Sequence, residues 1–502
     1  MKRKLLIVSF ALFCLFLWSF VATNKPATHK NTSNSEFYSS DPFSDTSLKR
    51  ICNCQKEPYN PIMRPIMPVD VSIFSNTTCG DCQPCFNSFA WQWFITLNWI
   101  ADPANPGMPD NKISAKNFGN PGDMRMVTWE SWKNAYDVFR DTKPDPWGSV
   151  SKTPGNKRII DGIDEANRGH FGTHQSDNTW LIDQNGNMVF YELRVNKDEF
   201  NYIFQNTLYS QEGIYKAFKD GPGINMPSGP GHYGDVGAIE VKASWMIVPD
   251  GQISQYSKKY KLAVAMVPDI KNNGRLVRKT LAMIGFHIAK KTPLSPQWVW
   301  ATFEHIDNAP DSNDFKNGTL KNKYNLYNPA LGNPGPVPNY ITPAARLNDP
   351  TKKYDKVQVI RANVIRDKSV IVNNGVRELI RSANPASVFQ YYELVDVQWP
   401  TAPTELTRDL MNNWLPTGCP APRFEANTTM ETYTQIRGSG GATSKSTDDC
   451  KVDDKDVGKS SCIGCHSKSA TTPNWTFKGP TTNEYWWTDY SSLFFKAKSI
   501  KQ

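Results

Sequence analysis

The sequence predicts an α+β fold, with a β-rich globular body whose strands are mostly antiparallel. Runs of β-branched and aromatic residues that are typical of strands recur between residues 236 and 304 and again at 391–399. An Asn185-Gly186 dipeptide between two further apolar runs is the signal of a tight hairpin. The chain shows no regular alternation of strands and helices and no repeat of fixed period. A parallel sheet or a solenoid is therefore not expected.

The composition agrees with a large folded body. The chain has 502 residues, of which 39% are hydrophobic and 12% aromatic. It lacks the series of apolar runs of about 20 residues that a polytopic membrane protein needs. Its 16 Trp, 19 Tyr and 25 Phe can bury far more surface than a disordered chain allows. The length predicts one large domain or two closely packed ones.

Local patterns predict the individual elements. Apolar residues at helical spacing predict an amphipathic helix over residues 86–100. The same spacing predicts a second helix over 129–139, with Thr128 as its N-cap, and residues 197–218 form a third candidate. Strands are expected in the following runs: TWLID, NMVFYELRV, VGAIEVKASWMIV, YKLAVAMV, TLAMIGFHIA, QWVWATFE and YYELVDVQW.

Changes in composition divide the chain into five segments. Residues 1–23 read as a signal peptide or N-terminal anchor, and the polar stretch 24–58 as a disordered tether. The α+β body covers 59–435. A flexible loop with almost no apolar side chain follows at 436–461, and 462–502 form the last segment.

The N-terminus predicts export. Lys2, Arg3 and Lys4 precede an apolar run from Leu5 to Val21, as in a secretory signal. The body is expected to be periplasmic or otherwise exported, either released or anchored to the cytoplasmic membrane by residues 1–23. The net charge is +9, and no basic block is interleaved with aromatic residues, so nucleic acid is not an expected partner.

Residues 462–466 read Cys-Ile-Gly-Cys-His, the C-x-x-C-H pattern of c-type haem attachment. Two thiols three positions apart can reach the two vinyl groups on one porphyrin edge, and the next imidazole can ligate the iron. A chain of this composition contains the pattern by chance in roughly three of a thousand cases. We expect one covalent haem c on Cys462 and Cys465, with His466 as proximal iron ligand. The rival interpretations are a redox pair that happens to precede a histidine and half of a zinc site.

The distal iron ligand must come from upstream or be absent, because the 36 residues after His466 contain neither Met nor His. His287 is the first choice. In the TLAMIGFHIA strand, Ala282, Ile284, Phe286 and Ile288 are expected to form one apolar face, which leaves His287 on the other. Further candidates are His170, His174, His232, His305, Met411 and Met430.

Aromatic residues cluster around the motif and could either shield a haem edge or dock the tail onto the body. They are Trp475, Phe477, Tyr485, Trp486, Trp487, Phe494 and Phe495.

The sequence resembles bacterial c-type cytochrome family proteins. More narrowly, it is similar to a poorly characterised group of exported proteins several hundred residues long with a single C-terminal attachment motif. The resemblance runs from about residue 85 to the end. It implies haem binding and electron transfer but no substrate, and only Cys462, Cys465 and His466 match a motif of known function. The segments that carry it are WQWFITLNW (91–99), IEVKASW (239–245), HIAKKTPLSPQWVWATFEH (287–305) and SSCIGCHSKS (460–469).

The other cysteines favour disulfides, as expected outside the cytoplasm. Cys79, Cys82 and Cys85 form a dense C-x-x-C-x-x-C cluster that lacks the histidine of a second haem site. A thioredoxin-like pair, an iron–sulfur run and a zinc or copper site at this cluster stay open. The remaining cysteines outside the motif and the export segment are Cys52, Cys54, Cys419 and Cys450.

Three functions fit this chemistry. The first is a mono-haem electron carrier that exchanges single electrons with a redox partner protein or a small-molecule donor or acceptor. The second is a haem enzyme of peroxidase or oxidase type, and the third a haem-based sensor, both with an open sixth iron position. The sequence offers no evident acid–base pair, Ser-His-Asp arrangement or H-E-x-x-H motif. The carrier is therefore favoured, and enzymatic activity is left open.

Overall fold

A computed structural model describes the central part of the body and pieces of the C-terminal segment. The described residues are 38–39, 61–68, 83–149, 181–229, 236–269, 275–331, 356–400, 420–421, 425–432, 435, 462–467, 469–471 and 486–499. They belong to one unit, Tyr38–Gln502. The predicted signal or anchor and the loop at 436–461 lie outside these residues, so both stay predictions. No helix in the described part of the chain has the length and apolar character needed to cross a membrane.

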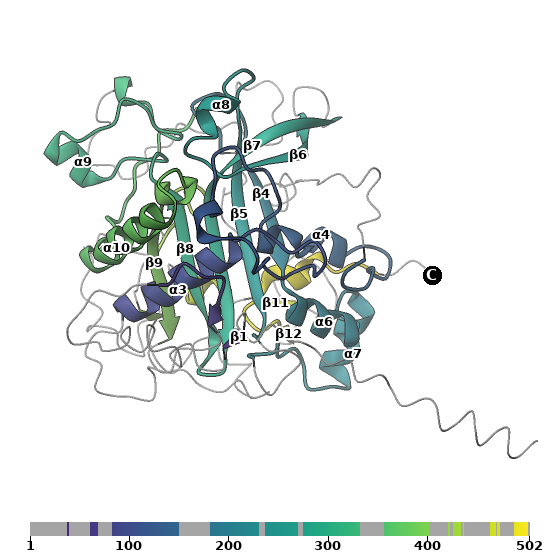
Figure 1. The fold of residues 1–502 in the computed structure, drawn as a ribbon. Helices are drawn as coiled ribbons and strands as arrows, with labels where there is room; N and C mark the ends of the chain where they lie inside the picture. The colour runs from purple at the N-terminus through teal and green to yellow at the C-terminus, as the bar shows by residue number, and fades with distance from the viewer. Residues whose placement is uncertain are drawn as a thin grey trace, which may run out of the picture. The chain divides into compact units, whose positions relative to one another are not determined.

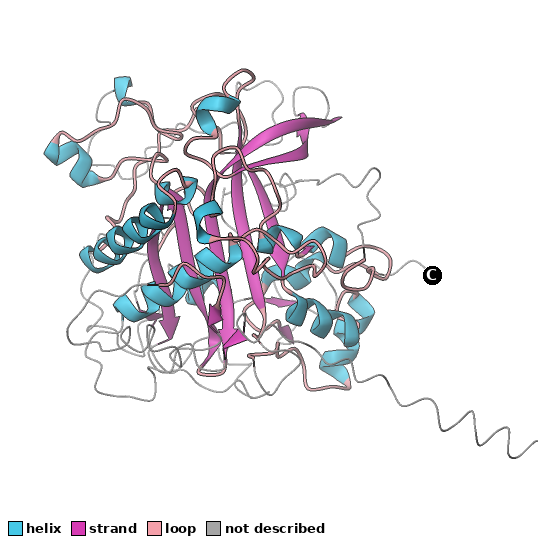
Figure 2. Cartoon of the chain, viewed as in Figure 1, coloured by secondary structure: helices cyan, strands magenta, loops and turns pink. Residues whose placement is uncertain are grey.

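One antiparallel sheet dominates the described residues. Its strands follow the order β10-β9-β8-β7-β5-β4-β3, and β6 pairs with the N-terminal part of β7. Figure 2 shows the strands of this sheet in magenta. All of these pairs are antiparallel, which confirms the predicted α+β fold. The bounds are β3 (Lys133–Asn134), β4 (Phe190–Val195), β5 (Ile239–Ile247), β6 (Leu262–Asp269), β7 (Arg275–Thr292), β8 (Ser295–His305), β9 (Tyr392–Pro400) and β10 (Pro420–Ala421).

Two small strand pairs complete the β-structure. The parallel pair consists of β1 (Tyr38–Ser39) and β2 (Met67–Pro68). The antiparallel pair consists of β11 (Ala470–Thr471) and β12 (Trp486–Trp487).

Helix α3 (Gln83–Leu97), the predicted helix at 86–100, covers one face of the sheet (Figure 1). The ring of Phe94 lies 4.5 Å from that of Phe303 in β8. Helix α10 (Asp367–Ala383) contacts both α3 and β9, and Trp91 Nε1 of α3 donates to Asn373 Oδ1 of α10 at 2.9 Å. Nearly every side chain of α3 is buried, because the sheet, α10 and the segment 61–68 all contact this helix.

The described residues form further helices. The α-helices are α4 (Ala135–Val138), α6 (Lys197–Gln205), α7 (Gln211–Lys219), α8 (Ile253–Tyr256), α9 (Ser312–Asn317) and α11 (Cys462–His466). The 3₁₀ helices are η2 (Ala115–Asn117), η3 (Thr128–Ser131), η6 (Pro329–Leu331), η7 (Val388–Tyr391) and η11 (Ser492–Lys496).

The helix predicted over 129–139 is wrong. The chain there forms η3, then β3, then the short α4. Trp129 packs against Phe286 while Trp132 donates from Nε1 to Gly107 O, and the O atom of Trp132 accepts from Arg194. Pairing of β3 with β4 replaces the helical hydrogen bonds, so tertiary packing overrides the periodic pattern.

The single helix predicted over 197–218 is two helices. Thr207, between α6 and α7, has φ 57°, a left-handed conformation that ends the first helix. Ser210 then caps the second helix by accepting from Gly213 N at 3.0 Å.

The apolar face expected on β7 is divided by a β-bulge. The β5–β7 register shifts between Ser244 and Trp245. Phe286 therefore packs against Phe94 of α3, whereas Ala282 and Ile284 lie in a separate cluster with Tyr191 and Met430. The prediction that these residues share one face is corrected, because a bulge shifts the alternation of a strand by one residue.

Candidate functional site

The sheet face opposite α3 carries a row of polar side chains. Lys242 of β5 pairs with His287 of β7, and His287 pairs with Thr302 of β8. Paired residues on neighbouring strands point to the same side of a sheet, so these three side chains share a face. His287 thus lies on the polar side, as its alternation with Phe286 and Ile288 predicts.

Residues 425–432 lie across this polar face. Asn427 donates from Nδ2 to Thr302 Oγ1 at 2.9 Å, and the hydroxyl groups of Ser244 and Thr429 lie 2.6 Å apart. At Gly285 a Cβ atom would lie 2.3 Å from Thr429 Oγ1. The close approach of this segment therefore requires the glycine in β7.

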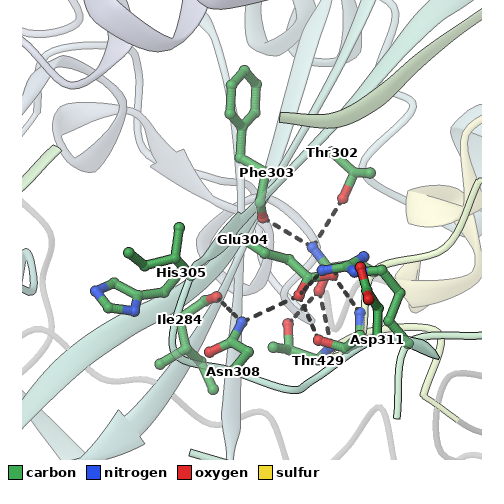
Figure 3. Close-up of polar contacts among 12 residues, drawn as sticks. Ile284, Thr302, Phe303, Glu304, His305, Asn308, Asp311 and Thr429 are labelled. Carbon is green, nitrogen blue, oxygen red and sulfur yellow. Dashed lines mark hydrogen bonds and ion pairs between the residues drawn. The ribbon is translucent and has the colours of Figure 1, made fainter. Parts of the chain in front are cut away.

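A buried ion pair anchors the same segment (Figure 3). Arg361 Nη2 lies 2.9 Å from Glu304 Oε2, and Thr428 N donates to Glu304 Oε1 at 2.5 Å. Asn308 Nδ2 joins the network 3.4 Å from Glu304 Oε2 and also donates to Ile284 O. Both charged side chains are almost fully buried, and removal of either would leave an unpaired charge.

The C-x-x-C-H residues form the one-turn helix α11, which contacts β8 and β9. Ile463 donates from its backbone N to Gln398 Oε1 at 2.8 Å, and its side chain is fully buried. The ring of His466 lies 4.2 Å from that of Trp300, which shares the polar side of β8 with Thr302. Helix α11 therefore lies on the face opposite α3.

A hydrogen bond orients the His466 ring. Its Nδ1 lies 2.9 Å from Tyr490 O and donates to it, because a carbonyl oxygen can only accept. This bond fixes the tautomer that keeps the lone pair on Nε2. Burial, assisted by the nearby charges of Lys242 and His287, lowers the pKa of His466 to about 4, although the hydrogen bond with Tyr490 O acts to raise it. The imidazole is therefore neutral near pH 7, as a metal ligand must be.

His287 forms an acid–base pair with Glu431. Its Nε2 lies 3.5 Å from Glu431 Oε2 and makes no hydrogen bond that satisfies normal geometry. Burial acts to raise the pKa of Glu431, but the charge of His287 and a bond from Asn427 N bring it below its usual value. Both side chains are about a quarter exposed. The sequence showed no such pair, and the structure forms one from residues 144 positions apart.

A buried carboxyl group, Glu425, lies near the first cysteine of the motif and is influenced by a second one, Asp396. Cys462 Sγ is 4.0 Å from Glu425 Oε2, and burial raises the pKa of Glu425 well above its usual value. The charge of Asp396 raises it further. Burial raises the pKa of Asp396 itself to about 6, against the charge of Arg366, which lies 3.4 Å from it. No sequence signal indicated Glu425, Glu431 or Asp396.

Other candidate ligands are engaged elsewhere or lie outside the described residues. His305 is a buried histidine whose Nε2 contacts Lys259 O and whose Nδ1 accepts from Asp307 N, and Met430 lies in an apolar cluster. His305 is therefore unsuited as an iron ligand, because both of its ring nitrogens are engaged. The candidates outside the described residues are His170, His174, His232 and Met411.

Most of the cysteines lie outside the described residues. No disulfide joins two described cysteines, and the side chain of Cys465 is not described. Cys85 is buried in α3, while Cys52, Cys54, Cys79, Cys82, Cys419 and Cys450 lie outside the described residues. Within the described part of the chain, no group of three or more His, Cys, Asp or Glu side chains is arranged to hold a metal ion.

The aromatic residues near the motif dock the tail onto the body. Trp486 and Phe494 are buried in one cluster with Ile463 and Trp300, and Trp486 stacks on Phe218 of α7. Trp486 and Phe494 therefore attach the C-terminal segment to the body, which is the second of the two roles expected for these aromatic residues. Trp475, Phe477 and Tyr485 lie outside the described part.

Comparison with protein-family models, with curated proteins and with solved structures found no match to this chain.

Proposed function

We propose that the chain is an exported mono-haem c protein that transfers single electrons, with the haem attached to Cys462 and Cys465 and ligated by His466. One observation carries the proposal. The histidine that ends the C-x-x-C-H motif is neutral and donates its Nδ1 proton to a backbone carbonyl, Tyr490 O. Metal-ligating histidines nearly always have such a partner on the second ring nitrogen.

The residues around the motif fit this cofactor. Ile463, Trp486 and Phe494 supply buried apolar surface next to His466, as an iron porphyrin requires. The side chains of His287 and Lys242 are close enough to His466 to act on its pKa. When bound, a haem supplies an iron that changes its oxidation state by one electron.

Covalent haem staining on a denaturing gel tests the attachment. The chain should be produced in a host that attaches haem c, as the wild type and as Cys462→Ser and Cys465→Ser variants. We expect the stain in the wild type and in a Cys85→Ser control, whose thiol is buried in α3. The stain should be reduced or lost in the two motif variants. An unstained wild type would refute the proposal.

A haem enzyme or sensor is the second candidate, and the His287–Glu431 pair favours it. A histidine 3.5 Å from a carboxylate can hold or move a proton next to a bound ligand. His287 can instead act as the distal iron ligand of a carrier.

The reduced optical spectrum separates the two candidates. Low-spin iron that ignores carbon monoxide supports the carrier, and His287→Ala should then give high-spin iron. High-spin iron that binds carbon monoxide in the wild type supports the enzyme or sensor. A low-spin spectrum unchanged in His287→Ala would remove His287 as the ligand.

A further inference from the structure

The carbonyl that orients His466 belongs to a strained turn. Residues 488–491 form a β-turn closed by Ser491 N donating to Thr488 O at 3.0 Å. Its central residues Asp489 and Tyr490 have φ 51° and 64°. Two positive φ angles mark a type I′ turn, whose central positions are normally glycine, asparagine or aspartate. A tyrosine in this conformation is unusual and strained.

Contacts of the Asp489 side chain hold this turn in place. Asp489 Oδ2 lies 2.7 Å from Lys291 Nζ and accepts from Met226 N at 2.6 Å. Both side chains of the ion pair are almost fully buried. Lys291 follows the β7 residues that pair with β5, and its Nζ also donates to Asn225 Oδ1. The ion pair with Lys291 thus connects the turn to strand β7 of the sheet.

A second connection ties the turn to the motif. Thr488 N donates to Ser469 O at 3.0 Å, and Ser469 lies three residues after His466. The turn is therefore hydrogen-bonded to the residues that directly follow α11, and Tyr490 O lies 2.9 Å from His466 Nδ1.

Neither component of this arrangement favours folding by itself. A buried ion pair rarely stabilises more than apolar residues of the same size, and a left-handed tyrosine is strained. Strained backbone persists where surrounding contacts determine it, and it concentrates at functional sites.

We infer that Asp489, anchored by Lys291, is a positioning residue that holds the Asp489–Tyr490 turn so that Tyr490 O fixes the His466 imidazole as an iron ligand. This inference rests on the proposed haem function. Asp489 acts through the backbone carbonyl of Tyr490 and does not touch the ligand ring itself.

The test is the double substitution Asp489→Asn with Lys291→Met in the haem-loaded full-length chain. It removes both buried charges together, so no charge is left unpaired. A weaker bond from Nδ1 makes His466 a poorer electron donor to iron. We expect a higher reduction potential of the haem and a partial shift from low-spin toward high-spin iron. Wild-type potential and spin state in the double variant would overturn the inference.

A matched control separates positioning from general loss of stability. Lys261 Nζ lies 3.3 Å from Glu130 Oε2, and this pair, also almost fully buried, joins η3 to the start of β6. Glu130→Gln with Lys261→Met should lower stability while leaving the potential and the spin state unchanged. Equal shifts in both double variants would contradict a specific role for Asp489.

If the double variant fails to attach haem, NMR of the His466 ring tests the inference without the cofactor. In the full-length chain labelled with ¹⁵N-histidine and produced without haem attachment, wild-type His466 should show only the Nδ1–H tautomer. The double variant should show both tautomers, and a single Nδ1–H tautomer there would overturn the inference. An unstained wild type would instead refute the proposed function, and the positioning role with it.

Discussion

The two faces of the sheet differ in what they bury. On the α3 side, Phe94, Phe286 and Phe303 pack ring against ring. On the other side, Lys242, His287 and Thr302 lie under a segment held by hydrogen bonds. Apolar burial stabilises a fold, whereas buried polar groups lower stability unless they are paired. The ring packing on the first face stabilises the fold, and the row of polar side chains on the second face calls for a functional explanation.

The largest expected effect lies on the apolar face. Phe94→Ala should lower the free energy of unfolding by about 3–5 kcal/mol, because it removes a fully buried ring from the centre of the aromatic cluster. Chemical denaturation measures this change. Haem attachment and spin state should be retained in the folded fraction. A destabilisation below about 1 kcal/mol would show that this face does not dominate stability.

Gly285→Ala tests the packing on the polar face. The new methyl group would lie 2.3 Å from Thr429 Oγ1 and 2.5 Å from Ser244 Oγ, so residues 427–431 must shift. We expect a loss of about 1–3 kcal/mol, together with a changed haem spectrum. Ala301→Gly serves as the control, because it makes a small change on the α3 side of the neighbouring strand β8. A normal spectrum in Gly285→Ala would separate this segment from the haem.

Glu431→Gln probes charge with little structural change. Glutamine keeps an acceptor for Asn427 N, which donates to Glu431 Oε2 at 2.8 Å, but removes a negative charge next to His287. The reduction potential of the haem should rise, because the oxidised iron loses a favourable charge. Stability should change by less than about 1 kcal/mol. Glu378→Gln removes the same charge from the exposed side of α10 and should leave the potential unchanged.

A further expected effect concerns two buried carboxyl groups. Burial raises the pKa of Glu240 to about 7 and that of Glu199 well above its usual value. Because the unfolded chain releases these protons at lower pH, the free energy of unfolding should fall as the pH rises from about 4.5 to about 7.

Denaturant unfolding of Glu240→Gln at several pH values checks this effect. A neutral side chain removes part of the dependence, so the decline over this interval should be less steep than in the wild type. Asp250→Asn, at a side chain that is 91% exposed, should retain the wild-type slope. An unaltered slope in Glu240→Gln would show that this carboxyl group titrates normally.

Sequence periodicity predicted the sheet better than the helices. The main strands and α3 were found because their apolar patterns are long and regular. Helix α10 was missed, although Val372, Val376 and Ile380 recur every four residues on its buried side. The β7 bulge and the left-handed Thr207 leave no periodic signal, since both depend on contacts with distant strands.

Residues of the candidate site were likewise predictable only where a local sequence pattern indicated them. A short motif indicated Cys462, Cys465 and His466 because its spacing alone carries the chemistry. Strand alternation placed His287 on the polar side. Glu431 and the turn at Asp489 could not be found in this way, because their partners lie 144 and 198 residues away in the chain.

The most direct test of the difference between the two faces is a measurement that shows which face of the sheet holds the haem. Methyl NMR spectra of the oxidised and reduced full-length protein report the distance of each methyl group from the paramagnetic iron. We predict large differences for Ile463 in α11 and Thr429 on the polar face, and negligible ones for Leu97 at the end of α3. Differences at Leu97 as large as those at Ile463 would contradict the assignment of the haem to the polar face.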